Sequence, residues 1–165
     1  MTERPAGYPL AIMTDSTFST DVADADFSCV DTADAQTVAR LRHELSRWLR
    51  AHFALDPVRL NDVLLAVNEA LTNAAEFAYP WQPGTMALEV RYDVTDRTLV
   101  VDVSDHGRWR DVDPATRSNT RGRGIPLMRA LSDRMTISRL PKGTHVQLQF
   151  GDCARVAAEA CATPA

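Results

Sequence analysis

The sequence lacks a long hydrophobic run: nowhere do about 18 apolar residues follow one another, as a membrane-spanning helix requires. The first stretch, "MTERPAGYPLAIMTDSTFSTDVADAD", also lacks the basic start and continuous apolar core of a secretory signal peptide. We therefore expect a cytoplasmic protein with no membrane partner.

Cysteine and positive charge are both scarce. The three cysteines, Cys29, Cys153 and Cys161, form no C-x-x-C pair, which argues against a disulfide framework and against a zinc site. The 18 lysines and arginines are outnumbered by 22 aspartates and glutamates and are mixed among them, giving a net charge of -4. Such a surface does not favour the phosphate backbone of nucleic acid. We expect free thiols and no direct nucleic-acid partner.

The chain is long enough for one compact core, with 45% apolar residues among 165. Residues 1–26 are rich in Asp, Ser, Thr and Ala without sustained periodicity, and are predicted to form a flexible N-terminal arm. Residues 27–150 carry the periodic patterns of a single domain. Residues 151–165 form a C-terminal tail, interpreted as either a short helix or a frayed end.

The first half of the domain reads as a short strand and two helices. The strand starts at Phe27, and apolar residues recur at helical spacing from about 38 to 52. Asp56 is suited to cap a second helix and Pro57 to its first position. That helix is predicted to run to about Tyr79, before a proline stops it.

The second half changes to the alternation typical of strands. Residues 86–105 predict an antiparallel hairpin with a turn at "TDR", followed by a structureless loop over 106–121. A helix is predicted over 125–135, and strands over 136–140 and 144–150 close the domain. The order predicts an α+β fold: a two-layer sandwich in which helices cover one face of a mixed, mostly antiparallel sheet.

Glu69 and Asn73 lie one turn apart in the second helix, within "LAVNEALTNAAEFAY". A helical wheel places them opposite the apolar side, so a solvated polar stripe is one interpretation. The other is that the pair faces a cleft, where a carboxylate can deprotonate a nucleophile and an amide oxygen can bind a hard cation such as Mg²⁺. Spacing alone does not decide between them.

Three later stretches carry similar alternatives. Asp105 and Gly107 end a strand, either as a simple turn or as an acceptor for the adenine amine beside bare backbone. "RGRG", which comprises Arg121, Gly122, Arg123 and Gly124, enters a helix directly, a context apt for binding an anion. The two arginines contact phosphates or are simply solvated. "GTHVQL" opens the last strand with a hairpin glycine and a threonine.

Together and in this order, the four stretches resemble the ATP-binding motifs of the GHKL superfamily, which has the Bergerat fold of histidine kinase-like ATPases. "NEALTNAAEFAY" resembles the N box, "DHGRW" and "RGRGIPLM" the two glycine boxes, and "GTHVQL" the terminal strand motif. The short loop between the glycine boxes and the wording "GRGIPLMRALSD" are most similar to RsbW-like anti-sigma factor serine kinases. The resemblance covers about residues 26–150.

The resemblance implies a role for each matching residue. Glu69 would be the general base, Asn73 would bind the Mg²⁺ that bridges the ATP phosphates, and Asp105 would accept from the adenine amine. Gly107 would lie against the purine, and Thr144 would support the adenine contact. Residues 108–121 would form a lid over ATP, and Gly122 and Gly124 would let the lid backbone close on the phosphates. Arg121 and Arg123 would also bind ATP.

The same resemblance implies the partners. The chain would be an ATP-dependent protein serine/threonine kinase that sequesters a sigma factor and phosphorylates a STAS-type anti-anti-sigma protein, as a homodimer. A non-catalytic ATP-binding or partner-binding module of the same fold is the alternative. The chain departs from many relatives at Phe77, where they have histidine, so we expect this side chain to pack and not to make a polar contact.

Overall fold

The structure is a computed structural model that describes residues 27–108 and 123–157. The predicted arm at 1–26 and most of the predicted loop at 106–121 lie outside these residues. In chain order the elements are β1 (Phe27–Thr32), α1 (Ala35–His52), α2 (Pro57–Phe77), β2 (Thr85–Asp93), β3 (Thr98–Asp105), α3 (Gly124–Leu131), β4 (Arg134–Leu140) and β5 (Gly143–Phe150).

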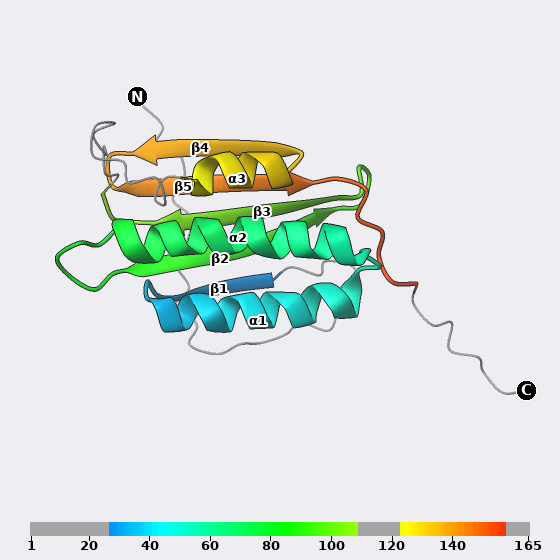
Figure 1. The fold of residues 1–165 in the computed structure, drawn as a ribbon, viewed down its shortest axis with the longest axis horizontal. Coiled ribbons are helices and arrows are strands. Elements are labelled where there is room, and N and C mark those ends of the chain that lie inside the picture. The colour runs from blue at the N-terminus through cyan, green and yellow to red at the C-terminus, as the bar shows by residue number, and fades with distance from the viewer. Residues whose placement is uncertain (1–26, 109–122, 158–165) are drawn as a thin grey trace, which may run out of the picture.

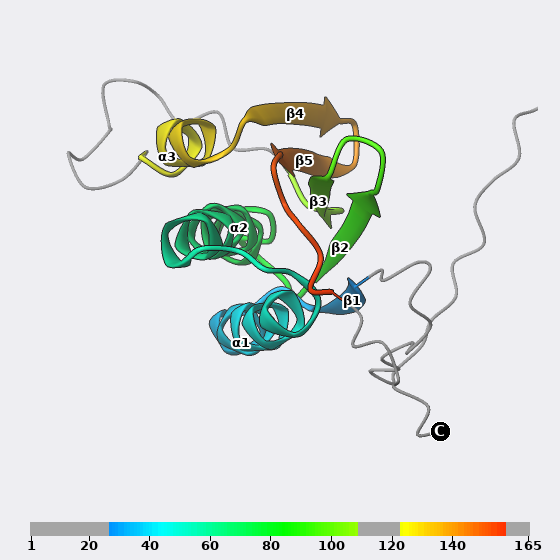
Figure 2. The same cartoon turned by 90° about the vertical axis from the view of Figure 1, so that its right-hand side faces the viewer.

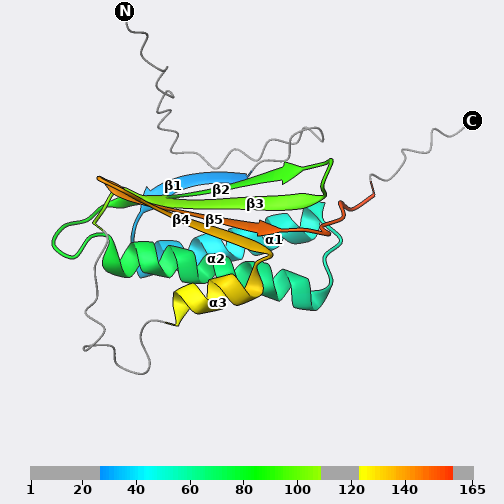
Figure 3. The same cartoon turned by 90° about the horizontal axis from the view of Figure 1, so that it is seen from above.

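The strands form one five-stranded sheet in the order β1-β2-β3-β5-β4. Every pairing between neighbouring strands is antiparallel. The helices α1, α2 and α3 all cover the same face of the sheet, with α2 between the other two (Figures 1, 2 and 3). This arrangement confirms the predicted two-layer α+β sandwich.

Both long helices begin at an aspartate. The Asp34 side chain accepts from the Thr37 backbone N–H at 2.7 Å, and Asp56 accepts from the N–H groups of Val58 and Arg59, each at 2.9 Å. These bonds satisfy N–H groups that have no partner inside the helix. With Pro57 as its first residue, α2 starts where the sequence predicts.

The core lies between the sheet and the helices. Alternate residues of the central strands are buried against α2, as the alternating pattern predicts. The fully buried set includes, from β2, Leu88 and Val90; from β3, Leu99 and Val101; and from α2, Val63, Val67 and Leu71.

The end of α3 differs from the prediction. We expected this helix to continue to residue 135, but it ends at Leu131, and Ser132 has extended backbone angles of φ -102° and ψ 151°. The Asp133 N–H donates to the Gln149 carbonyl at 2.9 Å, and the next residues pair with β5. The residues after Ser132 therefore form backbone hydrogen bonds with β5, although their apolar spacing also fits a helix.

In its described part, residues 151–157, the tail is neither helical nor frayed, so both interpretations are wrong for these seven residues. The Cys153 N–H donates to Arg97, and the Ala54 N–H donates to the Ala154 carbonyl at 2.8 Å. Cys153 is buried, which raises the pKa of its thiol. Cys29 and Cys153 are free, as predicted; Cys161 and residues 158–165 lie outside the described part of the chain.

The face of the sheet opposite the helices carries a polar network centred on Asp102. This carboxylate accepts from Arg91 at 2.6 Å and from Gln147 at 3.0 Å, and lies 2.8 Å from His145 Nε2. It is only 7% exposed, although α1, α2 and α3 all lie on the other face of the sheet (Figure 2). The Arg91 and Gln147 side chains hold its pKa below the ordinary value, although burial opposes them.

Candidate functional site

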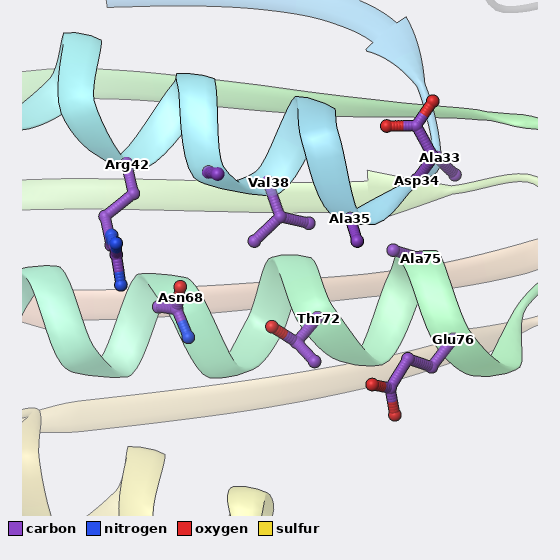
Figure 4. A pocket seen from close by; sticks show the side chains of 10 residues that line it. Ala33, Asp34, Ala35, Val38, Arg42, Asn68, Thr72, Ala75 and Glu76 are labelled. Carbon is purple, nitrogen blue, oxygen red and sulfur yellow. The ribbon is translucent and has the colours of Figure 1, made fainter.

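Helix α2 presents polar side chains in two directions. Asn68, Thr72 and Glu76 line a cleft of about 500 Å³ between α1 and α2 (Figure 4). Glu69 and Asn73 lie instead beside the start of α3 and are half-buried. A fully solvated stripe therefore does not describe Glu69 and Asn73, because a neighbouring helix begins directly next to them.

Gly124, the first residue of α3, makes this close approach. A Cβ added to it would lie 2.9 Å from the Glu69 Oε2 atom and 3.4 Å from Asn73 Nδ2. The glycine thus leaves just enough space for the carboxylate and the amide to face the helix start. Any larger residue would displace at least the Glu69 side chain.

No side chain of the described residues caps the N-terminus of α3. Arg123, at the capping position, has helical backbone angles and makes no capping hydrogen bond with its side chain, which is exposed. The first N–H groups of a helix have no partner within it and carry a partial positive charge. Here these N–H groups lie beside the Glu69 carboxylate and the Asn73 amide. This arrangement suits an anionic ligand that carries a bound cation.

Asp105 is a second polar centre, at the end of β3. Its carboxylate accepts from the Gly107 N–H at 2.9 Å, and its backbone pairs with Thr144 of β5. Both Asp105 and Thr144 are 8% exposed. Burial raises the pKa of Asp105, although the N–H groups of Gly107 and Thr144 favour the ionised form and partly oppose that shift.

Gly107 joins this centre to the end of α2. The Arg108 N–H donates to the Ala78 carbonyl at 2.9 Å, and a Cβ added to Gly107 would lie 2.0 Å from the same oxygen. The glycine is therefore required by close contact between two backbones. This contact holds the strand end that carries Asp105 against the helix that carries Glu69 and Asn73.

Tyr79 is a residue that the sequence reasoning missed. Its hydroxyl accepts from the His106 N–H at 2.7 Å and donates to the Thr85 carbonyl at 2.6 Å. It thereby fixes the residue after Asp105 to the loop that follows α2. A tyrosine directly after a helix is the only sequence signal, and it does not indicate which backbone groups the hydroxyl reaches.

The structure thus brings the described candidate residues into two adjoining groups. Glu69, Asn73 and Gly124 form the first; Asp105, Gly107 and Thr144 form the second. The end of α2 connects the two groups. Gly107 packs on Ala78, which lies roughly one helical turn beyond Asn73 and two to three turns beyond Glu69. Arg121 and Gly122 and most of the predicted lid lie outside the described residues.

The residues present fit a magnesium nucleotide better than a metal held by protein alone. Among residues 27–108 and 123–157 no group of three or more His, Cys, Asp or Glu side chains could hold a metal ion. Mg²⁺ commonly takes one or two protein oxygens and completes its shell with phosphate oxygens and water. The Asn73 amide oxygen lies beside the α3 N-terminus, 3.6 Å from the place that a Cβ on Gly124 would take.

The family model for the histidine kinase-like ATPase domain matches residues 32–150, most of the chain and both groups of candidate residues. The chain belongs to the histidine kinase-like ATPase domain family. Membership in this family implies ATP as the ligand of this ATPase domain. No curated protein matches the sequence.

Two solved structures are similar to parts of this chain, and the first of them supports its fold. One contains the RsbU and RsbW domains of Rv1364c from Mycobacterium tuberculosis, with a TM-score of 0.57 and 20% identity, covering 81% of this chain and 34% of that one. Another is the histidine kinase domain from Erythrobacter litoralis EL346 blue-light activated histidine kinase, with a TM-score of 0.43 and 26% identity, covering 56% and 44%. The chain spans less than half the length of either.

The part of the ATPase domain that the structure describes contains no helix long and apolar enough to cross a membrane.

Phe77 is the last residue of α2 and is half-buried.

Proposed function

We propose that this ATPase domain is a protein serine kinase that phosphorylates a STAS-type anti-anti-sigma protein and otherwise sequesters a sigma factor. The observation that carries the proposal is the meeting of Glu69, Asn73 and the uncapped α3 N-terminus at Gly124. A base, a metal-binding oxygen and an anion-binding backbone are what phosphoryl transfer requires, because the protein's main task is positioning and charge stabilisation.

Each residue then has a role. Glu69 accepts the proton of a serine hydroxyl as the phosphoryl group passes from ATP to that oxygen and ADP leaves. Asn73 would hold a Mg²⁺ ion, which would supply positive charge at the phosphates. The backbone at Gly124 binds phosphate oxygens, and Arg123 is exposed at the same helix end. Arg121 and Gly122, which lie outside the described residues, would bind the phosphates by the same resemblance.

The adenine end of the proposed site is the group around Asp105. The ionised carboxylate accepts from the adenine amine, and Thr144, its partner on β5, supports that contact. Gly107 lies against the purine with the side that is not packed on α2. A closed lid from residues 108–121 would exclude water from the phosphates.

The partners follow from the resemblance to RsbW-like proteins, which the fold of the Rv1364c structure supports. We propose a sigma factor and a STAS-domain protein as alternative partners of a cytoplasmic homodimer. A non-catalytic module of the same fold would bind ATP and a partner without phosphoryl transfer. Glu69, which lies beside the start of α3, supports the kinase, because a module that only binds needs no base.

The experiment is a transfer assay with Mg·ATP and purified STAS-domain proteins from the same genome. Wild type should produce phosphoserine on one of them, and Glu69→Gln should reduce the rate about 10²–10⁴-fold while ATP still binds. Glu76→Gln is the matched control, because Glu76 is on the same helix but lines the α1–α2 cleft. ATP binding and partner binding without transfer by wild type would establish the non-catalytic module instead.

A further inference from the structure

Trp81 stands out on the surface because it is 94% exposed, more than any other large apolar side chain in the described residues. It lies in the loop "YPWQPG", residues 79–84, between α2 and β2. Single exposed apolar residues are common and need no explanation by themselves. A tryptophan on an ordered loop beside a candidate active site does need one.

Several contacts that do not involve the tryptophan order this loop. The Tyr79 hydroxyl bonds to Thr85 and His106, and the Ala33 N–H donates to the Gly84 carbonyl at 2.9 Å. The Tyr79 ring packs so closely on Gly84 that an added Cβ would lie 2.1 Å from it. Two prolines further restrict the backbone. The loop is therefore held in place without any contribution from Trp81, so its folding does not explain this residue.

Two structural links connect this loop to the candidate site. It continues α2, and the helix rises about 12 Å from Glu69 to its end. Through Tyr79 the loop is also bonded to His106, the residue after Asp105. A folded protein that delivers a hydroxyl to Glu69 has a surface wide enough to cover this distance, since protein interfaces bury about 800 Å² on each partner.

We propose that Trp81 is a docking residue for the protein that receives the phosphoryl group, an inference that rests on the proposed kinase function. Exposed, rigidly mounted tryptophans carry much of the binding energy at protein interfaces, because they bury a large area and lose little conformational entropy. The partner accordingly presents an apolar pocket near its acceptor serine. Trp81 acts on partner affinity and takes no part in the chemical step.

The test is steady-state phosphorylation of the STAS-domain substrate by wild type, Trp81→Ala and the control Val94→Ala. Val94 is also exposed, at 64%, but lies in the β2–β3 turn at the opposite end of the sheet from Asp105. We expect Trp81→Ala to raise the KM for the protein substrate at least tenfold, with kcat, ATP affinity and thermal stability unchanged. Val94→Ala should match wild type.

The other results each contradict the inference. An unchanged KM would show that the partner does not contact Trp81, although kinase activity would stand. Weaker ATP binding by Trp81→Ala would mean that Trp81 contacts residues 108–121 over the nucleotide and not the partner. Conversion of a dimer to a monomer by the same change would mean that Trp81 contacts a second copy of the chain. Absence of transfer by wild type would overturn the proposed function first, and this inference with it.

Discussion

The first residue of α3, Gly124, lies against the Glu69 carboxylate with space for a hydrogen but not for a methyl group, since an added Cβ would come 2.9 Å from Oε2. The atom in the way is the end of a flexible side chain. A substitution at Gly124 therefore moves the proposed base at little cost to the fold, which separates catalysis from stability.

Gly124→Ala should reduce phosphoryl transfer at least tenfold while leaving the melting temperature equal or slightly higher. Alanine favours a helix over glycine by up to about 1 kcal/mol, which offsets the movement of Glu69. The measurements are the transfer rate and thermal unfolding. Gly151→Ala is the control, because its nearest neighbour, Asp133 Oδ2, is at an ordinary contact distance of 3.5 Å. A fully active Gly124→Ala would show that the position of Glu69 is not critical.

Gly107→Ala should behave in the opposite way and destabilise the protein. The added Cβ would lie 2.0 Å from the Ala78 carbonyl oxygen, and this backbone atom cannot move without disturbing the end of α2. Overpacking of this kind costs about 1–3 kcal/mol, to be measured as a lower midpoint of urea unfolding. An unchanged midpoint would mean that the loop and α2 can separate freely.

Asn73→Ala should abolish the effect of Mg²⁺ on ATP affinity, because the proposed protein ligand of the metal is lost. The measurement is calorimetric titration with ATP in the presence of Mg²⁺ and in the presence of a chelator. Thr72→Ala is the control, one residue earlier on α2 but facing the cleft toward α1. If Asn73→Ala keeps the Mg²⁺ effect of wild type, the metal is bound elsewhere.

ATP affinity should fall on acidification because of Asp105. Burial raises the pKa of this carboxyl, so it takes up a proton at a higher pH than an ordinary aspartate, whose value is 3.8. Only the ionised form accepts well from the adenine amine. Binding should therefore be strong above the raised pKa and weaken about tenfold for each pH unit below it.

The matching measurement is the pH dependence of ATP affinity in wild type and in Asp105→Asn. The variant should bind weakly and lack the Asp105 contribution, so the difference between the two profiles isolates this carboxyl from protonation of the phosphates. Parallel profiles would show that Asp105 does not contact the base.

Asp102 should contribute stability that is lost in acid. Its pKa is lowered in the folded protein, so the contribution is present above the ordinary value of 3.8 and disappears as pH falls through the folded pKa. Asp102→Asn should flatten the pH dependence of unfolding free energy below the ordinary carboxyl pKa of 3.8 and cost about 1–2 kcal/mol at neutral pH. Urea unfolding at several pH values measures both. An unchanged slope would remove Asp102 from the account of acid unfolding.

Local patterns predicted most of the fold. Asp56 and Pro57 start α2 because capping and a fixed φ act within one turn, and the alternation over 86–105 gives β2 and β3 because side chains in a strand alternate between its two faces. The end of α3 was mispredicted because Asp133 and the residues after it bond to β5, which is distant in sequence at Gln149. The spacing of apolar residues within one segment does not show which distant strand that segment will pair with.

Residue spacing is enough to predict that Glu69 and Asn73 share one side of a helix, and that glycines lie at the start of another helix. That these two features meet depends on the packing of the helices, because a helical wheel gives an angle about an axis and not the neighbour found at that angle. The sheet order places α2 between α1 and α3, so residues offset by one position, Thr72 and Asn73, face a cleft and a candidate active site respectively.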